Sequence, residues 1–384
     1  MDESVPVAGQ PEPLRRDERA RSVGRRRWLA AVLAAGVAVV LVGTFWRLPY
    51  YTLSPGSLRN TAPLVTVEGA PTFTDDGEIG YLTVSFAQTT PFGLVRAWVD
   101  DDIEVLDEDA ALGGRDLDEN RALNAQLMDN AKETATAVAL DALGYDVELL
   151  GTGAVIVGVE AGTPAADTLT VGDVVVGING VAVTTSSALT DEVLSLPVGA
   201  SVVLDVQRHS EASVAPEGAV GEPDVEQVTL TLGARPDDPT RAFLGVRSAT
   251  RDATWDLPFE VDVDSGNVIG PSAGLAFTLG IIDVLTPGSL TGGEVVAVTG
   301  TIAANGDVGI VGGVSQKAAT AIGAGAGVYL VPEAEVAAAE GRGGDELEVV
   351  GVATLLEALE ALANITGDRS VLDLVTANLV APVP

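Results

Sequence analysis

The feature that most constrains this chain is an uncharged run of 19 residues, from Trp28 to Trp46. At 1.5 Å per residue, a helix of that length reaches about 28 Å, which matches the hydrocarbon core of a bilayer. Tryptophan stands at both ends of the run, as is usual where a helix meets the membrane interface. We therefore expect residues 28–46 to form a transmembrane helix that holds the chain in a lipid bilayer.

The arginines before this run predict its orientation. Seven of them lie in a basic tail, residues 1–27, and basic flanks stay on the cytoplasmic side of a membrane. The sequence thus predicts a single-pass protein of the cell membrane, with a cytoplasmic N-terminus and all later domains outside. A cleaved signal peptide is one alternative, although the run is long for one and no clear Ala-x-Ala site follows it. A buried core helix is another, and the arginines argue against it.

Charge and composition exclude several kinds of partner and site. Beyond residue 50 the chain has 13 basic residues against 50 acidic ones, so it repels phosphate backbones and should not bind nucleic acid. The chain has no cysteine, which excludes thiol catalysis and disulfides. Its single histidine, His209, excludes a metal site built from several histidines, and we expect that side chain in a solvated loop. We predict no metal and no cofactor.

Two regions precede the chemistry-bearing part of the chain. Residues 47–149 are predicted to be an α/β region outside the membrane, with a strand at 80–86 and a helix over 117–143. Residues 150–235 are predicted to be β-rich. Within that second region, a stretch rich in Pro, Gly, Glu and Ala at 210–226 predicts a mobile loop.

The β-rich region carries a recognisable order of segments. We expect strands at 154–159, 174–178 and 202–207, with a helix at 185–194. Between the first two strands lie Thr-Pro-Ala-Ala and then Val-Gly-Asp, and Asn-Gly follows the second strand. This order resembles a PDZ domain, and the resemblance implies that an extended peptide binds by adding a strand beside the helix. Two segments compete as the carboxylate-binding loop, Leu150–Gly153 and Phe243–Val246.

Residues 258–367 hold the candidate catalytic groups. Ser272 lies in Gly-Pro-Ser-Ala-Gly at the start of an apolar helix, where an ordinary N-cap serine is the alternative to a nucleophile. Lys317 lies in the first turn of a second helix, among small and apolar residues. The chain has only two lysines against 19 arginines, so a generic positive charge does not require lysine here. A desolvated lysine near a helix N-terminus has a lowered pKa and can act as a base, whereas Lys132 is expected to be an exposed surface lysine.

The ordered motifs of this region resemble the proteolytic domain of Lon-type serine peptidases. They are Gly-Pro-Ser-Ala-Gly, then Thr-Gly at 299–300, then Gly-Asp-Val-Gly-Ile-Val-Gly-Gly at 306–313, with Lys317 four residues later. The resemblance implies Ser272 as nucleophile, Lys317 as general base, and Thr299 as a hydrogen-bond partner of the lysine. Two departures are Ile269, which stands where the family often has an acid, and the lack of a Gly-x-x-x-x-Gly-Lys-[Ser/Thr] nucleotide loop.

Together these features predict an α+β multidomain protein that ends in a tail, residues 368–384. We expect an ATP-independent serine endopeptidase that hydrolyses unfolded or flexible polypeptides outside the cytoplasmic membrane. Membrane-anchored, PDZ-containing Lon-like proteins of bacteria resemble the whole chain best, and that resemblance makes a homo-oligomer possible. The alternative is a membrane-tethered, PDZ-type peptide-binding or scaffold protein whose peptidase domain is inactive.

Overall fold

The computed structural model describes residues 15–74, 76–209, 225–236, 238–344 and 346–380. The chain divides into two compact units. The first holds residues 1–65, 73–132 and 263–372, and the second holds residues 66–72, 133–262 and 373–384. The predicted mobile loop at 210–226 lies outside the described residues except for its last two, which belong to a strand.

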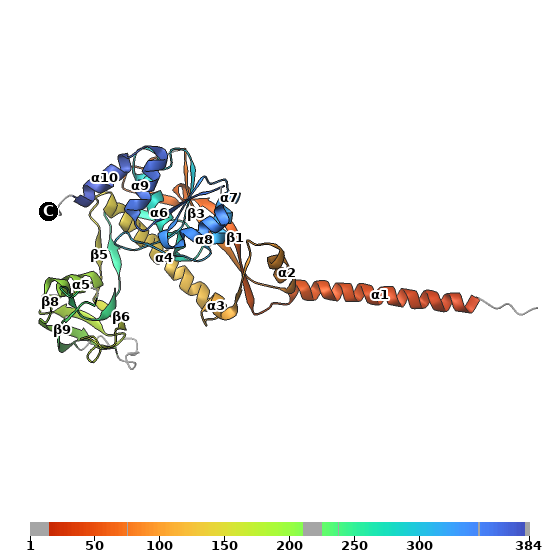
Figure 1. Cartoon of the computed structure of the whole chain (residues 1–384), viewed down its shortest axis with the longest axis horizontal. Helices are drawn as coiled ribbons and strands as arrows, with labels where there is room; N and C mark the ends of the chain where they lie inside the picture. Colours follow the sequence, from red (N-terminus) through yellow and green to blue (C-terminus); the bar gives the residue numbers. More distant parts are fainter. Residues whose placement is uncertain (1–14, 75, 210–224, 237, 345, 381–384) are drawn as a thin grey trace, which may run out of the picture. The chain divides into compact units, whose positions relative to one another are not determined.

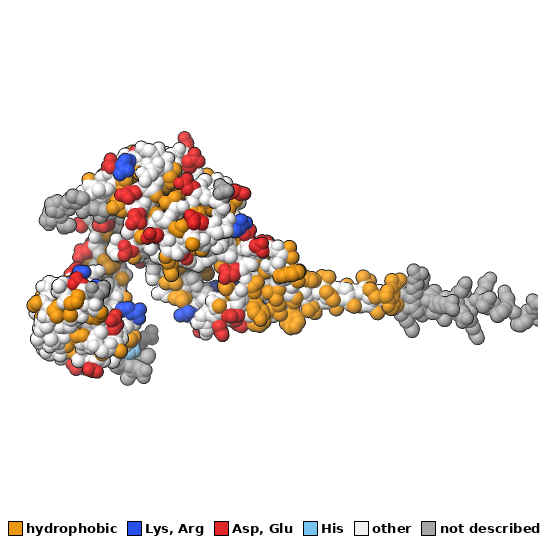
Figure 2. All heavy atoms as spheres, in the orientation of Figure 1, with side chains coloured by type: hydrophobic (Ala, Val, Ile, Leu, Met, Phe, Trp, Pro, Cys, Tyr) orange, Lys and Arg blue, Asp and Glu red, His pale blue; other side chains and the backbone are white. Residues whose placement is uncertain are grey.

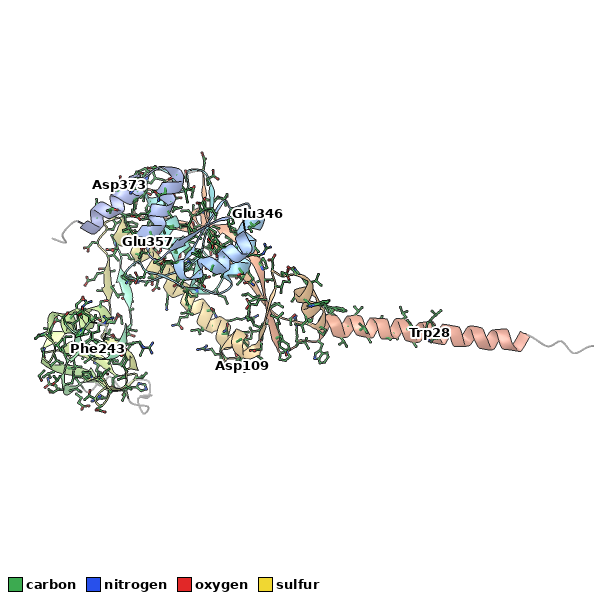
Figure 3. The ribbon with its side chains drawn as sticks, viewed as in Figure 1. Trp28, Asp109, Phe243, Glu346, Glu357 and Asp373 are labelled. Carbon is green, nitrogen blue, oxygen red and sulfur yellow. The ribbon has the colours of Figure 1, made fainter. Side chains whose placement is uncertain are left out.

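The N-terminal helix α1 (Arg15–Phe45) contains the predicted membrane segment. Its stretch Trp28–Phe45 has a mean hydropathy of 2.3, and only 6% of that stretch is buried. Figure 2 shows hydrophobic side chains covering this part of the helix. Figure 3 marks Trp28, the first residue of the apolar stretch. Among the described residues, α1 is the one helix long and apolar enough to cross a membrane, a criterion that an N-terminal signal sequence also meets. The helix ends one residue before Trp46.

A mixed sheet forms the centre of the first unit. Its strand order is β20-β19-β16-β3-β1-β4, in which β3, β16, β19 and β20 run parallel and β1 is antiparallel to both of its neighbours. A short hairpin of β17 and β18 follows β16 in the chain. The strands of this unit are β1 (Tyr50–Asn60), β3 (Glu78–Gln88), β4 (Glu104–Asp107), β16 (Val295–Val298), β17 (Thr301–Ile302), β18 (Val308–Gly309), β19 (Val328–Pro332) and β20 (Glu348–Val352).

Helices pack around this sheet, as Figure 1 shows for α6 to α9. All twelve residues of α6 are buried, which explains why its sequence is apolar on every face. The predicted helix at 117–143 is confirmed as α4, whose last turns belong to the second unit. The helices are α2 (Pro91–Val99), α3 (Glu108–Leu112), α4 (Leu117–Ala142), α6 (Gly274–Leu285), α7 (Val314–Gly323), α8 (Val336–Gly343) and α9 (Leu355–Thr366), with short 3₁₀ turns η1 (Ala62–Leu64), η2 (Pro271–Ala273) and η3 (Glu333–Glu335).

The second unit contains a five-strand path, β10-β9-β7-β6-β13, with β8 paired to β7. Helix α5 (Ser186–Ser195) is capped at its N-terminus by Thr185, whose side chain accepts a hydrogen bond from the Ala188 N–H. Strands β6 (Ala154–Val159), β7 (Val174–Ile178) and β9 (Ser201–Gln207) confirm the three predicted strands. The others are β8 (Val181–Ala182), β10 (Val225–Thr231) and β13 (Val246–Thr250). Alternating apolar side chains from these strands and from α5 fill one core.

Three two-stranded ladders and one helix complete the second unit. The pairs are β2 with β15, β5 with β14, and β11 with β12. These elements are β2 (Val65–Glu68), β5 (Glu148–Leu150), β11 (Gly233–Ala234), β12 (Ala242–Phe243), β14 (Thr254–Asp256), β15 (Glu260–Val263) and α10 (Ser370–Val380), whose first turn belongs to the first unit.

The two units do not coincide with the regions predicted from sequence. Strands β1, β3 and β4 come from the region 47–149, yet they share a sheet with β16, β19 and β20 from the region 258–367. The link is direct, because residues Glu78–Tyr81 of β3 pair in parallel with Val295–Val298 of β16. The region 47–149 therefore contributes structure to the unit that carries Ser272 and Lys317.

Candidate active site

Ser272 is held in a short turn just before α6. Gly270 precedes it with φ +101°, a backbone conformation that favours glycine, and its N–H donates to the Asn124 carbonyl at 2.9 Å. The Ser272 carbonyl accepts from the Gly300 N–H at 3.0 Å and from Thr299 Oγ1 at 3.2 Å. The N-cap position of α6 is Ala273, and no side-chain cap is formed. The N-cap alternative for Ser272 is thus wrong, and its hydroxyl is not used to hold the helix.

Lys317 lies on α7 with a buried side chain, only 2% exposed. Its Nζ donates a hydrogen bond of 3.0 Å to Thr299 Oγ1, at the end of β16. Burial lowers the pKa of Lys317 to about 8, and the Glu335 carboxylate opposes that shift. The lowered pKa agrees with the expectation from the apolar neighbours of Lys317. The amine can therefore reach its neutral form near neutral pH.

Ser272 and Lys317 line the same pocket, a cavity of about 450 Å³ within the first unit. Thr299 does not line the cavity, although it accepts the hydrogen bond from Lys317. No hydrogen bond joins Ser272 to Lys317 in the described part of the chain. The structure therefore brings the lysine and the threonine into contact, and the serine and the lysine both line one cavity.

Strand β3 forms a long wall of this pocket, through residues 81–88. Beyond Tyr81, β3 pairs with β1 on one edge, while β16 pairs only with residues 78–81 on the other. Within the described residues, no strand covers that second edge after Tyr81. A free strand edge offers backbone N–H and C=O groups to an extended chain.

No signal in the sequence indicates that this strand belongs to the pocket. The stretch around β3 and α4 contains no catalytic spacing, yet Asn120, Arg121 and Met128 of α4 also line the cavity. Lys132, further along α4, is half-buried rather than exposed, with 24% of its side chain accessible and an ion pair to Asp129 at 3.8 Å. Among the described residues, no group of His, Asp and Glu could hold a metal ion.

A second cavity, of about 290 Å³, lies in the second unit between α5 and residues 242–248. Leu189, Val193 and Leu194 of α5 form one side of it. Of the two segments that competed as a carboxylate loop, Phe243–Val246 lines this cavity and Leu150–Gly153 does not. Gly245 has φ +86°, so the loop turns sharply beside the groove. Figure 3 marks Phe243 in this unit.

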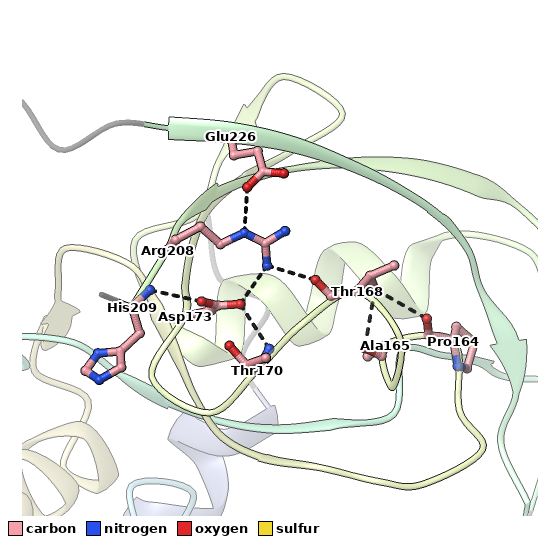
Figure 4. Close-up of polar contacts among 8 residues, drawn as sticks. All are labelled: Pro164, Ala165, Thr168, Thr170, Asp173, Arg208, His209 and Glu226. Atoms are coloured by element: carbon pink, nitrogen blue, oxygen red, sulfur yellow. Dashed lines mark hydrogen bonds and ion pairs between the residues drawn. The ribbon is translucent and has the colours of Figure 1, made fainter. Parts of the chain in front are cut away.

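Asp173, of the Val-Gly-Asp segment before β7, has a structural role. The Asp173 side chain is buried, and its carboxylate accepts hydrogen bonds from the N–H groups of Thr170 and His209, both at 3.0 Å. Arg208 donates to it at 2.8 Å and also contacts Glu226 (Figure 4). Although burial alone would raise it, these contacts hold the pKa of Asp173 below its usual value. His209 is exposed, as expected.

Comparisons with known proteins agree with this architecture. The family model of the PDZ domain matches residues 141–215, and that of the Lon protease (S16) C-terminal proteolytic domain matches residues 254–361. The matching models include no ATPase domain. A comparison with curated proteins found no match.

Solved structures that resemble the chain include PDZ domains. One belongs to an SdrC-like protein of Listeria monocytogenes, at 24% identity and a TM-score of 0.20, covering 25% of this chain and 87% of that one. Another belongs to an SdrC-like protein of Listeria innocua, at 21% identity and a TM-score of 0.20, covering 25% of this chain and 92% of that one. The two family matches carry the conclusion: the chain contains a PDZ domain and a Lon protease C-terminal proteolytic domain, which indicates a Lon-type serine peptidase.

Proposed function

We propose that this chain is a membrane-anchored endopeptidase that cleaves unfolded or flexible polypeptides without ATP, with Ser272 as nucleophile and Lys317 as general base. The observation that carries the proposal is the buried Lys317 amine, with its pKa lowered to about 8, in the lining of the same cavity as Ser272. Independence from ATP is supported by the lack of a nucleotide loop in the sequence. A buried amine that lines a cavity contributes little to stability, but its lowered pKa suits it to act as a base.

The chemistry follows from these positions. Ser272 Oγ attacks the carbonyl carbon of the scissile bond while its proton passes to Lys317 Nζ. The lysine then gives that proton to the leaving nitrogen as the C–N bond breaks, and a water activated by the same amine hydrolyses the acyl ester. Thr299 orients the amine through its hydrogen bond. We assign the N–H groups of Ser272 and Ala273 to the oxyanion, because amides at a helix start lack intrahelical partners.

The substrate is proposed to bind as a strand along the free edge of β3. An extended peptide there would pair with residues 82–88, which lead along the wall of the cavity that holds Ser272. Backbone pairing is independent of side-chain identity, so it suits unfolded segments of many sequences. Most strands of a folded protein are already paired within their own sheets, so unfolded segments supply such a strand more readily.

The PDZ domain is proposed to select or present protein substrates. Its groove offers apolar side chains from α5 and the turn at Phe243–Val246, where a peptide end with an apolar side chain could dock. The proposed placement outside the cytoplasm rests on the seven arginines that precede Trp28.

Removal of either dyad member should abolish turnover. We expect Ser272→Ala and Lys317→Ala to lose about 10²-fold or more in rate, which is the usual scale of general-base assistance. Lys317→Arg should be nearly as inactive, because arginine keeps its proton. Thr299→Val should cost less, and Thr299→Ser should restore most of that loss. The measurement is cleavage of casein and of a short fluorogenic peptide by the full chain in detergent.

Matched controls keep this test specific. Lys132→Arg changes the other lysine of the chain, and Ser315→Ala removes a hydroxyl on α7 that donates to the Ala338 carbonyl. Both controls should cleave at the normal rate. An active Lys317→Arg enzyme would show that the lysine acts as a charge, and the general-base assignment would be withdrawn.

Activity should rise with pH through about 8 and then level off. Since the pKa of Lys317 is lowered from 10.5 to about 8, the neutral amine predominates above that pH and the protonated, inactive form predominates below it. The Glu335 carboxylate raises this pKa, so Glu335→Gln should move the midpoint to lower pH. Glu333→Gln, in the same short turn, serves as the control and should leave the midpoint in place. A rate–pH profile that Glu335→Gln does not move would contradict the assignment.

Blocking the PDZ groove should impair protein substrates only. We expect Leu194→Asp to raise KM for casein by placing a charge in the apolar groove, while cleavage of the short peptide stays unchanged. Asp191→Asn, on the same helix but outside the groove lining, is the matched control. Equal losses on both substrates would mean that the domain supports the fold and does not select substrates.

The proposed orientation predicts digestion from outside the cell. A protease added to intact cells that express the full chain should remove the part after residue 46 and leave the basic tail protected. An epitope tag at each end reports which part survives. Digestion that requires permeabilised cells would reverse the orientation.

A further inference from the structure

Helix α2 (Pro91–Val99) is an apolar helix without a core position. It has the sequence Pro-Phe-Gly-Leu-Val-Arg-Ala-Trp-Val, with Arg96 as its one charge, and none of its residues is buried. Trp98 is 85% exposed, Val99 is 74% exposed, and Val95 is 58% exposed. A short amphipathic helix is normally held by packing its apolar side on a core. Most of the apolar side chains of α2 face outward instead.

This exposed side continues the surface of α1. The Phe92 ring lies against Gly43 of α1, where an added Cβ would come within 2.5 Å of the ring. Arg47 Nη1 donates to the Gln88 carbonyl at 2.7 Å and the Leu48 N–H donates to the Thr89 carbonyl at 3.0 Å, which fixes the end of α1 beside the start of α2. Figure 2 shows hydrophobic side chains running from α1 onto the adjoining end of the first unit, where Figure 1 places α2.

The residues at this junction are of the types found at membrane interfaces. Phe45 is 72% exposed and Trp46 is 60% exposed at the end of α1, and α2 adds the exposed Trp98. Tryptophan prefers the interface because its ring is apolar and its N–H stays near water. Three acids, Asp100–Asp102, follow α2 directly, so attraction to anionic lipid cannot hold it there.

We infer that α2 lies in the interface of the bilayer that α1 enters, with Val95, Trp98 and Val99 among the acyl chains. This inference rests on the proposed membrane anchoring. A helix of nine residues binds a membrane weakly by itself. Because α1 tethers α2 close to the bilayer, the effective concentration of lipid around α2 is high. Strand β3 runs from the pocket wall through Thr89 and Thr90 into α2. Docking of α2 therefore fixes the strand that lines the pocket with respect to the bilayer surface.

Depth-dependent quenching of a single tryptophan tests this placement. The full chain with Trp28→Phe, Trp46→Phe and Trp255→Phe keeps only Trp98 and is reconstituted into phosphatidylcholine vesicles. Lipids brominated near the headgroup end of the acyl chain should quench Trp98 more strongly than lipids brominated near the chain end. Aqueous iodide should quench it weakly. A second protein that keeps only Trp46 reports on the end of α1 and is expected to be quenched by the same shallow bromines.

Substitution of the exposed face gives the matched comparison. Val95→Asp with Val99→Asp should abolish the bromolipid quenching of Trp98 and expose it to iodide, because carboxylates are costly among acyl chains. Ile310→Asp charges another exposed apolar residue of the same unit, 70% accessible, and should leave Trp98 quenching unchanged.

Three outcomes would overturn the inference. If Trp46 is quenched by bromolipid and Trp98 only by iodide, α1 is anchored and α2 lies in water. If neither is quenched by bromolipid, the proposed anchor fails together with α2. If Trp98 is shielded from both quenchers and becomes accessible to iodide on dilution of the protein in the vesicles, a second copy of the chain covers α2 in place of lipid.

Discussion

The hydrogen bond from the buried Lys317 amine to Thr299 is the interaction on which the candidate site depends. Moving the pKa of a lysine from 10.5 to about 8 corresponds to a cost on the order of 3 kcal/mol for keeping the amine charged in the folded state. That cost applies in full below about pH 8, and it disappears as the pH rises toward 10.5, where the unfolded chain also releases the proton. The fold gives up this stability to hold a neutral amine at a cavity wall.

Close approach of two backbone segments brings Ser272 and Thr299 together beside the Lys317 amine. Gly274 begins α6 where an added Cβ would lie 2.9 Å from the Ile302 N, so a larger residue would push the helix away from β17. Gly300 follows Thr299 with φ +152°, and its N–H holds the Ser272 carbonyl. The glycines of the Pro-Ser-Ala-Gly and Thr-Gly motifs therefore position the candidate side chains, because they let the two backbone segments approach closely.

Local elements and the candidate dyad could be predicted because their signals lie within short stretches. Strand β7 and helix α7 follow from periodicity and turn residues, and the scarcity of lysine singled out Lys317. The strand partners could not be predicted in this way. The alternation of apolar residues in β3 does not identify β16 as its neighbour, since those strands lie more than 200 residues apart in the chain. The part that β3 plays in the pocket could not be predicted for the same reason. Nor could the hydrogen bond from Arg208 to Asp173, because these residues lie 35 positions apart in the chain.

The acidity of the chain constrains how the peptidase can be held near a membrane. Beyond residue 50 it carries 50 acids against 13 basic residues, so an anionic bilayer surface would repel it within a Debye length, about 8 Å at physiological salt. Electrostatic attachment of this acidic part of the chain is therefore unfavourable, and apolar contact can offset the repulsion. The exposed apolar side chains of α1 and α2 lie together at one end of the first unit (Figure 2). The same repulsion favours water over the lipid surface for the rest of the acidic part of the chain.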